Sequence, residues 1–211
     1  MLRGSSNTEA GIHFAPFPIG ISVGSLGCGI AMNRTGRHYW LGVLSMFLFN
    51  LGTGLFCSFD LDTPDAPQYL SLFLFGAGYG ASLTTGLVAL IAAVKHSEQA
   101  TATSASYLFR STGGTMGAAA GAAVFQTALR TNLDRRLGGG EVAREITERV
   151  LRDFKEVLKV EMPWRSLVVD AYMQALWTVF FTAFLMGTLG MLATAATREH
   201  KLPRRLDRED L

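Results

Sequence analysis

Charged residues are missing from long stretches of this sequence. Only 17% of the 211 residues are charged, whereas soluble domains carry roughly 25%. Nine of the 19 lysines and arginines fall in residues 130–165, and five more follow residue 197. A soluble globular core is therefore not expected. The net charge is only +2, and the sequence shows no basic face with interleaved aromatic residues. It therefore indicates no nucleic-acid partner.

Reactive residues are also scarce. The two cysteines, Cys28 and Cys57, lie in apolar stretches without a CxxC motif or a neighbouring histidine. They are expected to be buried hydrophobic residues rather than a disulfide or metal site. No H-E-x-x-H motif, His/Cys cluster or pair of carboxylates occurs in the apolar stretches. The sequence therefore predicts no enzyme activity, no catalytic residue, no metal and no cofactor.

What the chain does have is five long apolar runs. About 20 helical residues cross the hydrocarbon of a bilayer, so runs of this length predict spanning helices. Irregular backbone cannot face lipid, and β-barrel alternation is not seen. We expect an all-α fold, a polytopic transmembrane bundle of about five spans. The runs are Phe14–Asn33, Tyr39–Phe59, Ala66–Val94, Ser104–Thr127 and Ala171–Thr197.

Residues 142–158 have a different pattern. Apolar residues recur every four positions from Val142 to Leu158, charged residues fill the other face, and three glycines precede the segment. This predicts one amphipathic extramembrane helix, which either packs on the protein's own surface or lies in the membrane interface. The expected layout is four spans in 1–127, this loop in 128–165, the last span in 166–197 and a charged tail in 198–211.

Basic residues in the short loops predict the orientation. Arg34 and Arg37 follow the first span, Lys95 follows the third, and five basic residues follow the fifth. The loop after the second span, residues 60–68, has three aspartates and no basic residue. The positive-inside rule therefore predicts a cytoplasmic C-terminus. The nine basic residues of 130–165, on the outer side, oppose this orientation.

The loop after the first span has a recognisable motif. Gly29, Asn33, Arg34, Gly36 and Arg37 match the spacing G-x-x-x-D-R-x-G-R, except that Asn33 replaces the acid. The motif resembles the loop signature of the major facilitator superfamily. In that family the loop acid and arginines form a conformation-dependent charge network, so the resemblance implies a conformational-switch loop. A generic basic loop would explain the arginines but not the two glycines.

Polar and small residues inside the spans are candidate functional groups. Arg110 is a costly charge in a spanning helix, which either faces a substrate cavity or snorkels to the headgroups. In the third run Tyr79 lies within Gly76-Ala-Gly78-Tyr79-Gly80, and Thr84 and Thr85 follow, where a glycine-rich helix break near mid-membrane would place a substrate site. Gly113, Gly117 and Gly121 form a small-x-x-x-small face, which predicts close helix packing.

A more specific resemblance covers residues 11–125. Phe17–Gly27, the Arg34–Arg37 loop and Ser104–Gly113 are similar to the fungal fourteen-span drug:proton antiporters, which include vacuolar basic amino-acid permeases and multidrug efflux pumps. The resemblance implies the C-terminal part of a transporter for drugs, toxins or amino acids, in the plasma or vacuolar membrane. Its partners would be the lipid bilayer, a small-molecule substrate, protons and the missing N-terminal half. Because residues 1–11 read like an interior loop, the alternative is a truncated, transport-incompetent membrane protein that acts as an interaction partner or remnant.

Overall fold

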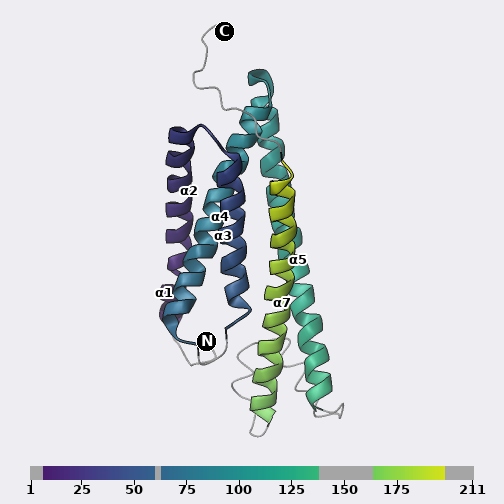
Figure 1. Cartoon of the computed structure of the whole chain (residues 1–211). Helices are drawn as coiled ribbons and strands as arrows, with labels where there is room; N and C mark the ends of the chain where they lie inside the picture. Colours follow the sequence, from purple (N-terminus) through teal and green to yellow (C-terminus); the bar gives the residue numbers. More distant parts are fainter. Residues whose placement is uncertain (1–6, 60–62, 138–163, 198–211) are drawn as a thin grey trace.

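The computed structural model describes residues 7–59, 63–137 and 164–197, and every regular element in these ranges is helical (Figure 1). The all-α fold expected from the apolar runs is therefore confirmed. The predicted amphipathic helix at 142–158 and the charged tail lie outside the described residues. The helices are α1 (Asn7–Phe14), α2 (Pro16–Thr35), α3 (Tyr39–Phe56), α4 (Asp65–Ala93), the 3-10 turn η1 (His96–Glu98), α5 (Gln99–Leu137) and α7 (Trp164–Ala195).

Four helical segments are long and apolar enough to cross a membrane, namely Gly11–Thr35, Tyr39–Phe56, Asp65–Ala93 and Ser166–Ala195. Each contains most of one predicted span. The remaining predicted span, Ser104–Thr127, lies within α5, which is 39 residues long. Alanine, glycine, serine and threonine make up most of this stretch, and Arg110 interrupts it. It is therefore long enough to cross a bilayer but less apolar than the other four.

The helices pack side by side in an order that differs from their order in the chain. α2 packs on α4, α4 on α3, α3 on α7 and α7 on α5, with a smaller contact between α4 and α5 (Figure 1). α4 is thus flanked by α2 and α3, while α5 lies at an edge and is held chiefly by α7. Many large apolar side chains on the outside are exposed, including Leu26, Phe47 and Leu189, as expected of helices that face lipid.

Glycines allow α4 to approach both neighbours closely. A Cβ on Gly76 or Gly80 would overlap the carbonyl oxygen of Phe17 or Ile21 in α2, and a Cβ on Gly78 would overlap the backbone nitrogen of Phe49 in α3. The expectation of a helix break here is wrong, because α4 runs without interruption from Asp65 to Ala93. Its glycines are needed for packing rather than for an irregular backbone.

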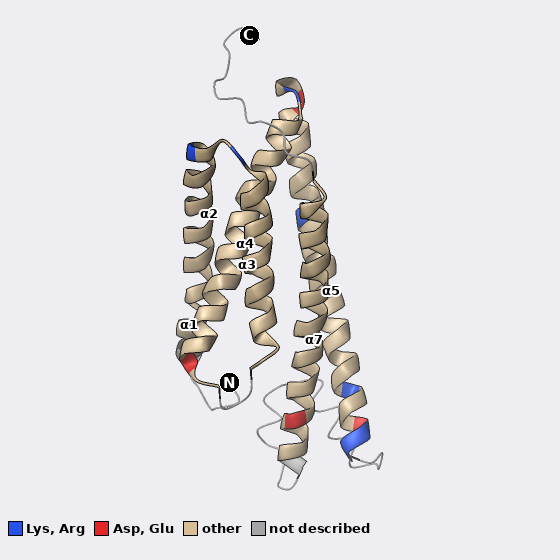
Figure 2. Ribbon diagram, viewed as in Figure 1, with Lys and Arg blue, Asp and Glu red and all other residues tan. Residues whose placement is uncertain are grey.

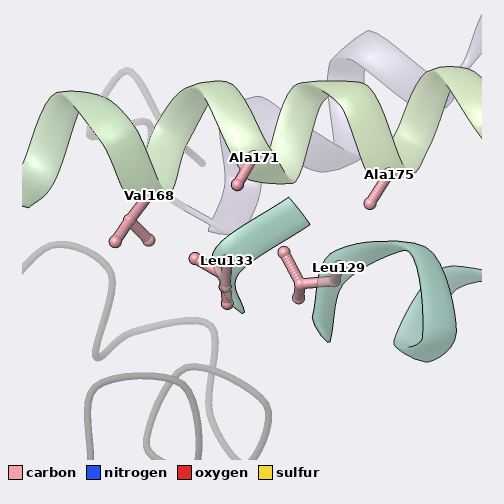
Figure 3. Close-up of a cluster of buried hydrophobic side chains, with 5 residues drawn as sticks. All are labelled: Leu129, Leu133, Val168, Ala171 and Ala175. Atoms are coloured by element: carbon pink, nitrogen blue, oxygen red, sulfur yellow. The ribbon is translucent and has the colours of Figure 1, made fainter. Parts of the chain in front are cut away.

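A second core joins α5 to α7. Leu129 and Leu133 of α5 are buried against Val168, Ala171 and Ala175 of α7 (Figure 3). The Phe125 and Tyr172 rings make an edge-to-face contact beside this cluster, with centroids 5.0 Å apart. Just beyond it, Arg136 forms a salt bridge of 3.3 Å with Asp170. These contacts hold the C-terminal part of α5 against the N-terminal part of α7.

Charged residues gather at the two ends of the described bundle (Figure 2). The loop between α2 and α3, the α4–α5 connection and the end of α7 share one end, where the Tyr39 hydroxyl donates to the Ala195 carbonyl at 2.9 Å. The start of α4 and the facing ends of α5 and α7 lie at the other. The predicted basic loops are thus placed together, as a single membrane side requires.

Candidate functional site

Arg110 is half-buried on α5, and its guanidinium carbon lies 5.3 Å from the centre of the Tyr107 ring. These residues are three positions apart, so they lie on one face of the helix. A cation over an aromatic face gains electrostatic attraction, which offsets part of its cost in an apolar setting. Among the described residues no acidic side chain pairs with Arg110.

The three candidates on α4 point in different directions. Tyr79 is 36% exposed and lies between the Phe17 ring, 6.5 Å away, and the Phe49 ring, 6.4 Å away. The Thr84 hydroxyl shares a hydrogen bond of 2.8 Å with Ser25 of α2. Thr85 is buried, and its hydroxyl donates to the Ala81 carbonyl in its own helix. Tyr79 and Thr84 are therefore already engaged with neighbouring helices.

An open groove of about 470 Å³ lies between α5 and α7. None of the four predicted cavity residues lines this groove. Its lining is mostly apolar and consists of Ala123, Val124, Thr127, Ala128, Thr131, Asn132 and Thr178. The cavity role of Arg110, Tyr79, Thr84 and Thr85 therefore stays a prediction.

The small-residue face of α5 is open. Nothing described lies within 4 Å of a Cβ added at Gly113, Gly117 or Gly121. Two glycine pairs do pack closely between α2 and α4: added Cβ atoms on Gly20 and Gly24 would meet Phe73 and Ala77 of α4, and those on Gly76 and Gly80 would meet Phe17 and Ile21 of α2. Both pairs have the same small-x-x-x-small spacing, which the sequence reasoning used only for α5. The packing role of the α5 face stays a prediction, and it needs a partner other than these helices.

The motif loop after α2 is short and largely exposed. Gly36 has a left-handed backbone, with φ 67°, and its N–H donates to the Met32 carbonyl at 2.8 Å, which closes the end of α2. Glycine adopts this conformation without the steric cost of a side chain, which explains its place in the motif. Asn33, Arg34 and Arg37 are exposed, and a Cβ on Gly29 would touch nothing. The switch role of the loop stays a prediction.

Sequence reasoning missed two buried polar residues. Asn50 of α3 is 5% exposed and hydrogen-bonds to α7. His38, between the motif and α3, is 6% exposed, and its Nδ1 has no hydrogen-bond partner among the described residues. The signal for Asn50 was available, since it is the sole amide in the run Tyr39–Phe59.

A nucleophile-like spacing in α2 was also overlooked. Gly20-Ile-Ser22-Val-Gly24 matches G-x-S-x-G by its letters, but that motif requires a strand-to-helix elbow. Here Ser22 lies inside α2, and its hydroxyl donates to the Pro18 carbonyl one turn earlier at 3.0 Å. The spacing therefore has a helical explanation, and it does not indicate a hydrolase.

The chain is 29% identical to the multidrug resistance protein fnx1 of Schizosaccharomyces pombe, over 96% of this chain and 39% of that protein. It is 28% identical to the vacuolar membrane amino acid uptake transporter fnx2 of the same yeast, over 87% of this chain and 32% of fnx2. It is 26% identical to the MFS-type efflux transporter ffsH of Aspergillus flavipes, over 98% of this chain and 37% of ffsH.

No family model matches the chain. No solved structure matches it either. The chain spans less than two fifths of the length of the curated relatives just named. Of these relatives, fnx2 and ffsH are named as transporters and fnx1 as a multidrug resistance protein. Similarity over nearly the whole chain, together with the helical bundle, supports a partial transporter of the major facilitator type.

Proposed function

We propose that the chain forms part of a proton-coupled antiporter that moves small organic molecules, such as drugs, toxins or amino acids, across a plasma or vacuolar membrane. The observation that carries the proposal is the similarity of 87–98% of the chain to transporters named for multidrug resistance, amino acid uptake and efflux. The open face of α5 supports it, because a helix from the rest of such a transporter has room to pack there. Proton coupling rests on the sequence resemblance.

In this proposal Arg110 faces the substrate path and Tyr79, Thr84 and Thr85 contribute polar groups near it. The motif loop switches between conformations by pairing Arg34 and Arg37 with a helix end outside this chain. Their exposure supports this role, since both arginines are accessible to such a partner. The neutral Asn33 can contribute hydrogen bonds but no charge to the network.

The test is solute flux into vesicles that contain the complete transporter, with a pH gradient as the driving force. We expect Arg110→Ala to lower uptake at least tenfold, because the substrate path loses its only charged group in α5's predicted span. Arg130→Ala, outside that span, is the matched control and should leave uptake within about twofold. Wild-type uptake by the Arg110→Ala variant would contradict the cavity role.

The second candidate is the alternative that the sequence leaves open. In this alternative the protein is a transport-incompetent membrane protein that acts as an interaction partner or remnant. The full-length transcript separates the two. An open frame that continues upstream of Met1 into further apolar spans supports the transporter. An in-frame stop codon directly upstream supports the alternative.

A further inference from the structure

The contact between α3 and α7 follows one repeating pattern. Residues of α3 spaced four apart face α7 in antiparallel order. Gly42 lies against Thr194, Met46 against Gly190, Asn50 against Gly187 and Gly54 against the Phe184 ring. Three of these four contacts pair a glycine with an apolar atom. Such contacts would re-form with little change if α7 slid along α3 by one turn, about 5.4 Å.

Asn50 is the exception in this pattern. It lies about 16 Å along α3 from Tyr39, at 1.5 Å per residue, and thus deep in the span. Its side chain is 5% exposed. The amide orientation that satisfies its surroundings has Nδ2 donating to the Phe184 carbonyl at 3.1 Å, while Oδ1 accepts from the Thr188 hydroxyl at 2.9 Å and the Thr188 N–H at 3.0 Å. The amide therefore contacts one particular turn of α7.

Gly187 makes room for this contact. A Cβ on Gly187 would lie only 2.9 Å from the Asn50 amide group. A slide of α7 by one turn would place the amide against different residues and leave it unpaired in an apolar setting, where no water can replace the lost partners. One polar side chain can fix the register of otherwise interchangeable apolar contacts, as asparagine does in coiled coils.

We propose that Asn50 is a positioning residue that sets the register of α7 against α3 and, through α7, the placement of α5. The position of α5 depends on α7, because its main attachment is the core in which Leu129 and Leu133 pack against α7. The Tyr39–Ala195 hydrogen bond at the bundle end supports the same register. This inference concerns helix packing and holds whether or not the chain transports a solute.

Disulfide trapping in membranes tests the register directly. In a full chain with Cys28 and Cys57 replaced by alanine, Met46→Cys is combined with Gly190→Cys for the observed register or with Thr194→Cys for the shifted one. A disulfide requires Cα atoms within about 7 Å, so only the 46/190 pair should form efficiently. With Asn50→Leu added, we expect the yield of the 46/194 pair relative to 46/190 to rise about threefold to twentyfold, the range for losing an interhelical hydrogen bond in a membrane.

Matched variants separate the amide from general loosening. Thr53→Val removes an equally buried hydroxyl that donates within α3, to the Phe49 carbonyl, and it should leave the trapping pattern unchanged. Thr188→Val should have a smaller effect than Asn50→Leu, because the amide keeps two backbone partners. If Asn50→Leu prevents folding, Gly187→Ala serves instead, since its methyl group displaces the amide. An unchanged 46/190 preference in Asn50→Leu, or an equal shift in Thr53→Val, would overturn the proposal.

Discussion

Glycine has two different uses in this chain. At Gly36 it supplies a left-handed backbone that ends α2 and turns the chain into the motif loop. At Gly76, Gly78 and Gly80 the backbone is helical, and the absence of a side chain lets α4 touch both α2 and α3. Substitutions at these positions should therefore fail for different reasons, strain in the first case and steric overlap in the second.

Gly80→Ala should destabilise the bundle. The added methyl group would overlap the Ile21 carbonyl oxygen, and overpacking of a tight interface costs about 1–3 kcal/mol. Gly86→Ala in the same helix has open space at its Cβ and should be neutral or stabilising, because alanine favours helix by about 0.5–1 kcal/mol. Thermal unfolding in detergent, followed by circular dichroism, measures both. Equal midpoints for the two variants would contradict the close α2–α4 contact.

At the scale of the helix, the apolar runs predicted the helical type and the approximate positions of five helices, four of which contain segments apolar enough to cross a membrane. They did so because spanning length and hydropathy are local properties. Which small-residue face packs against which helix could not be predicted in this way. Gly113, Gly117 and Gly121 have the same spacing as Gly20 and Gly24. In the described structure, however, only Gly20 and Gly24 pack against another helix. The partner of Asn50 lies 138 residues away in sequence, so its role could not be read locally.

α5 should insert into a membrane less readily than its neighbours, and Arg110 should be the main reason. Near a helix centre arginine disfavours insertion by roughly 2.5–3.5 kcal/mol, whereas leucine favours it by about 0.5 kcal/mol. In a translocon-insertion assay of residues 99–137, Arg110→Leu should raise the inserted fraction several-fold. Arg135→Leu, beyond the predicted span, is the control and should change it little. Equal gains in both variants would place the span further along α5.

For the whole molecule, the helix directions place the loop after α2 and the α4–α5 connection at one end, and the start of α4 at the other (Figure 2). This agrees with the alternation that the basic loops predicted. Which end faces the cytoplasm is inferred from the positive-inside rule, because helix packing alone does not assign a membrane side. The orientation with a cytoplasmic C-terminus is therefore our proposal.

Labelling of single cysteines should show which side of the membrane each end of the bundle faces. In a background with Cys28 and Cys57 replaced by alanine, Arg37→Cys and His96→Cys should react with a membrane-impermeant maleimide from the same side. Ala66→Cys, at the exposed start of α4, should react from the opposite side. In sealed vesicles the first two should label only with cytoplasmic access. Labelling of Arg37→Cys and Ala66→Cys from one side would contradict the described helix directions.

The alternating glycines of α4 also determine how much room the bundle occupies in a bilayer. Gly76 and Gly80 face one neighbour and Gly78 faces the other, so three helices share a narrower cross-section than three helices with ordinary side chains would. Lipids press laterally on any embedded protein. A motion that separated α4 from α2 or α3 would have to widen this cross-section against that pressure. We therefore expect α2, α3 and α4 to move as one body, with any rearrangement confined to the edge where α5 lies.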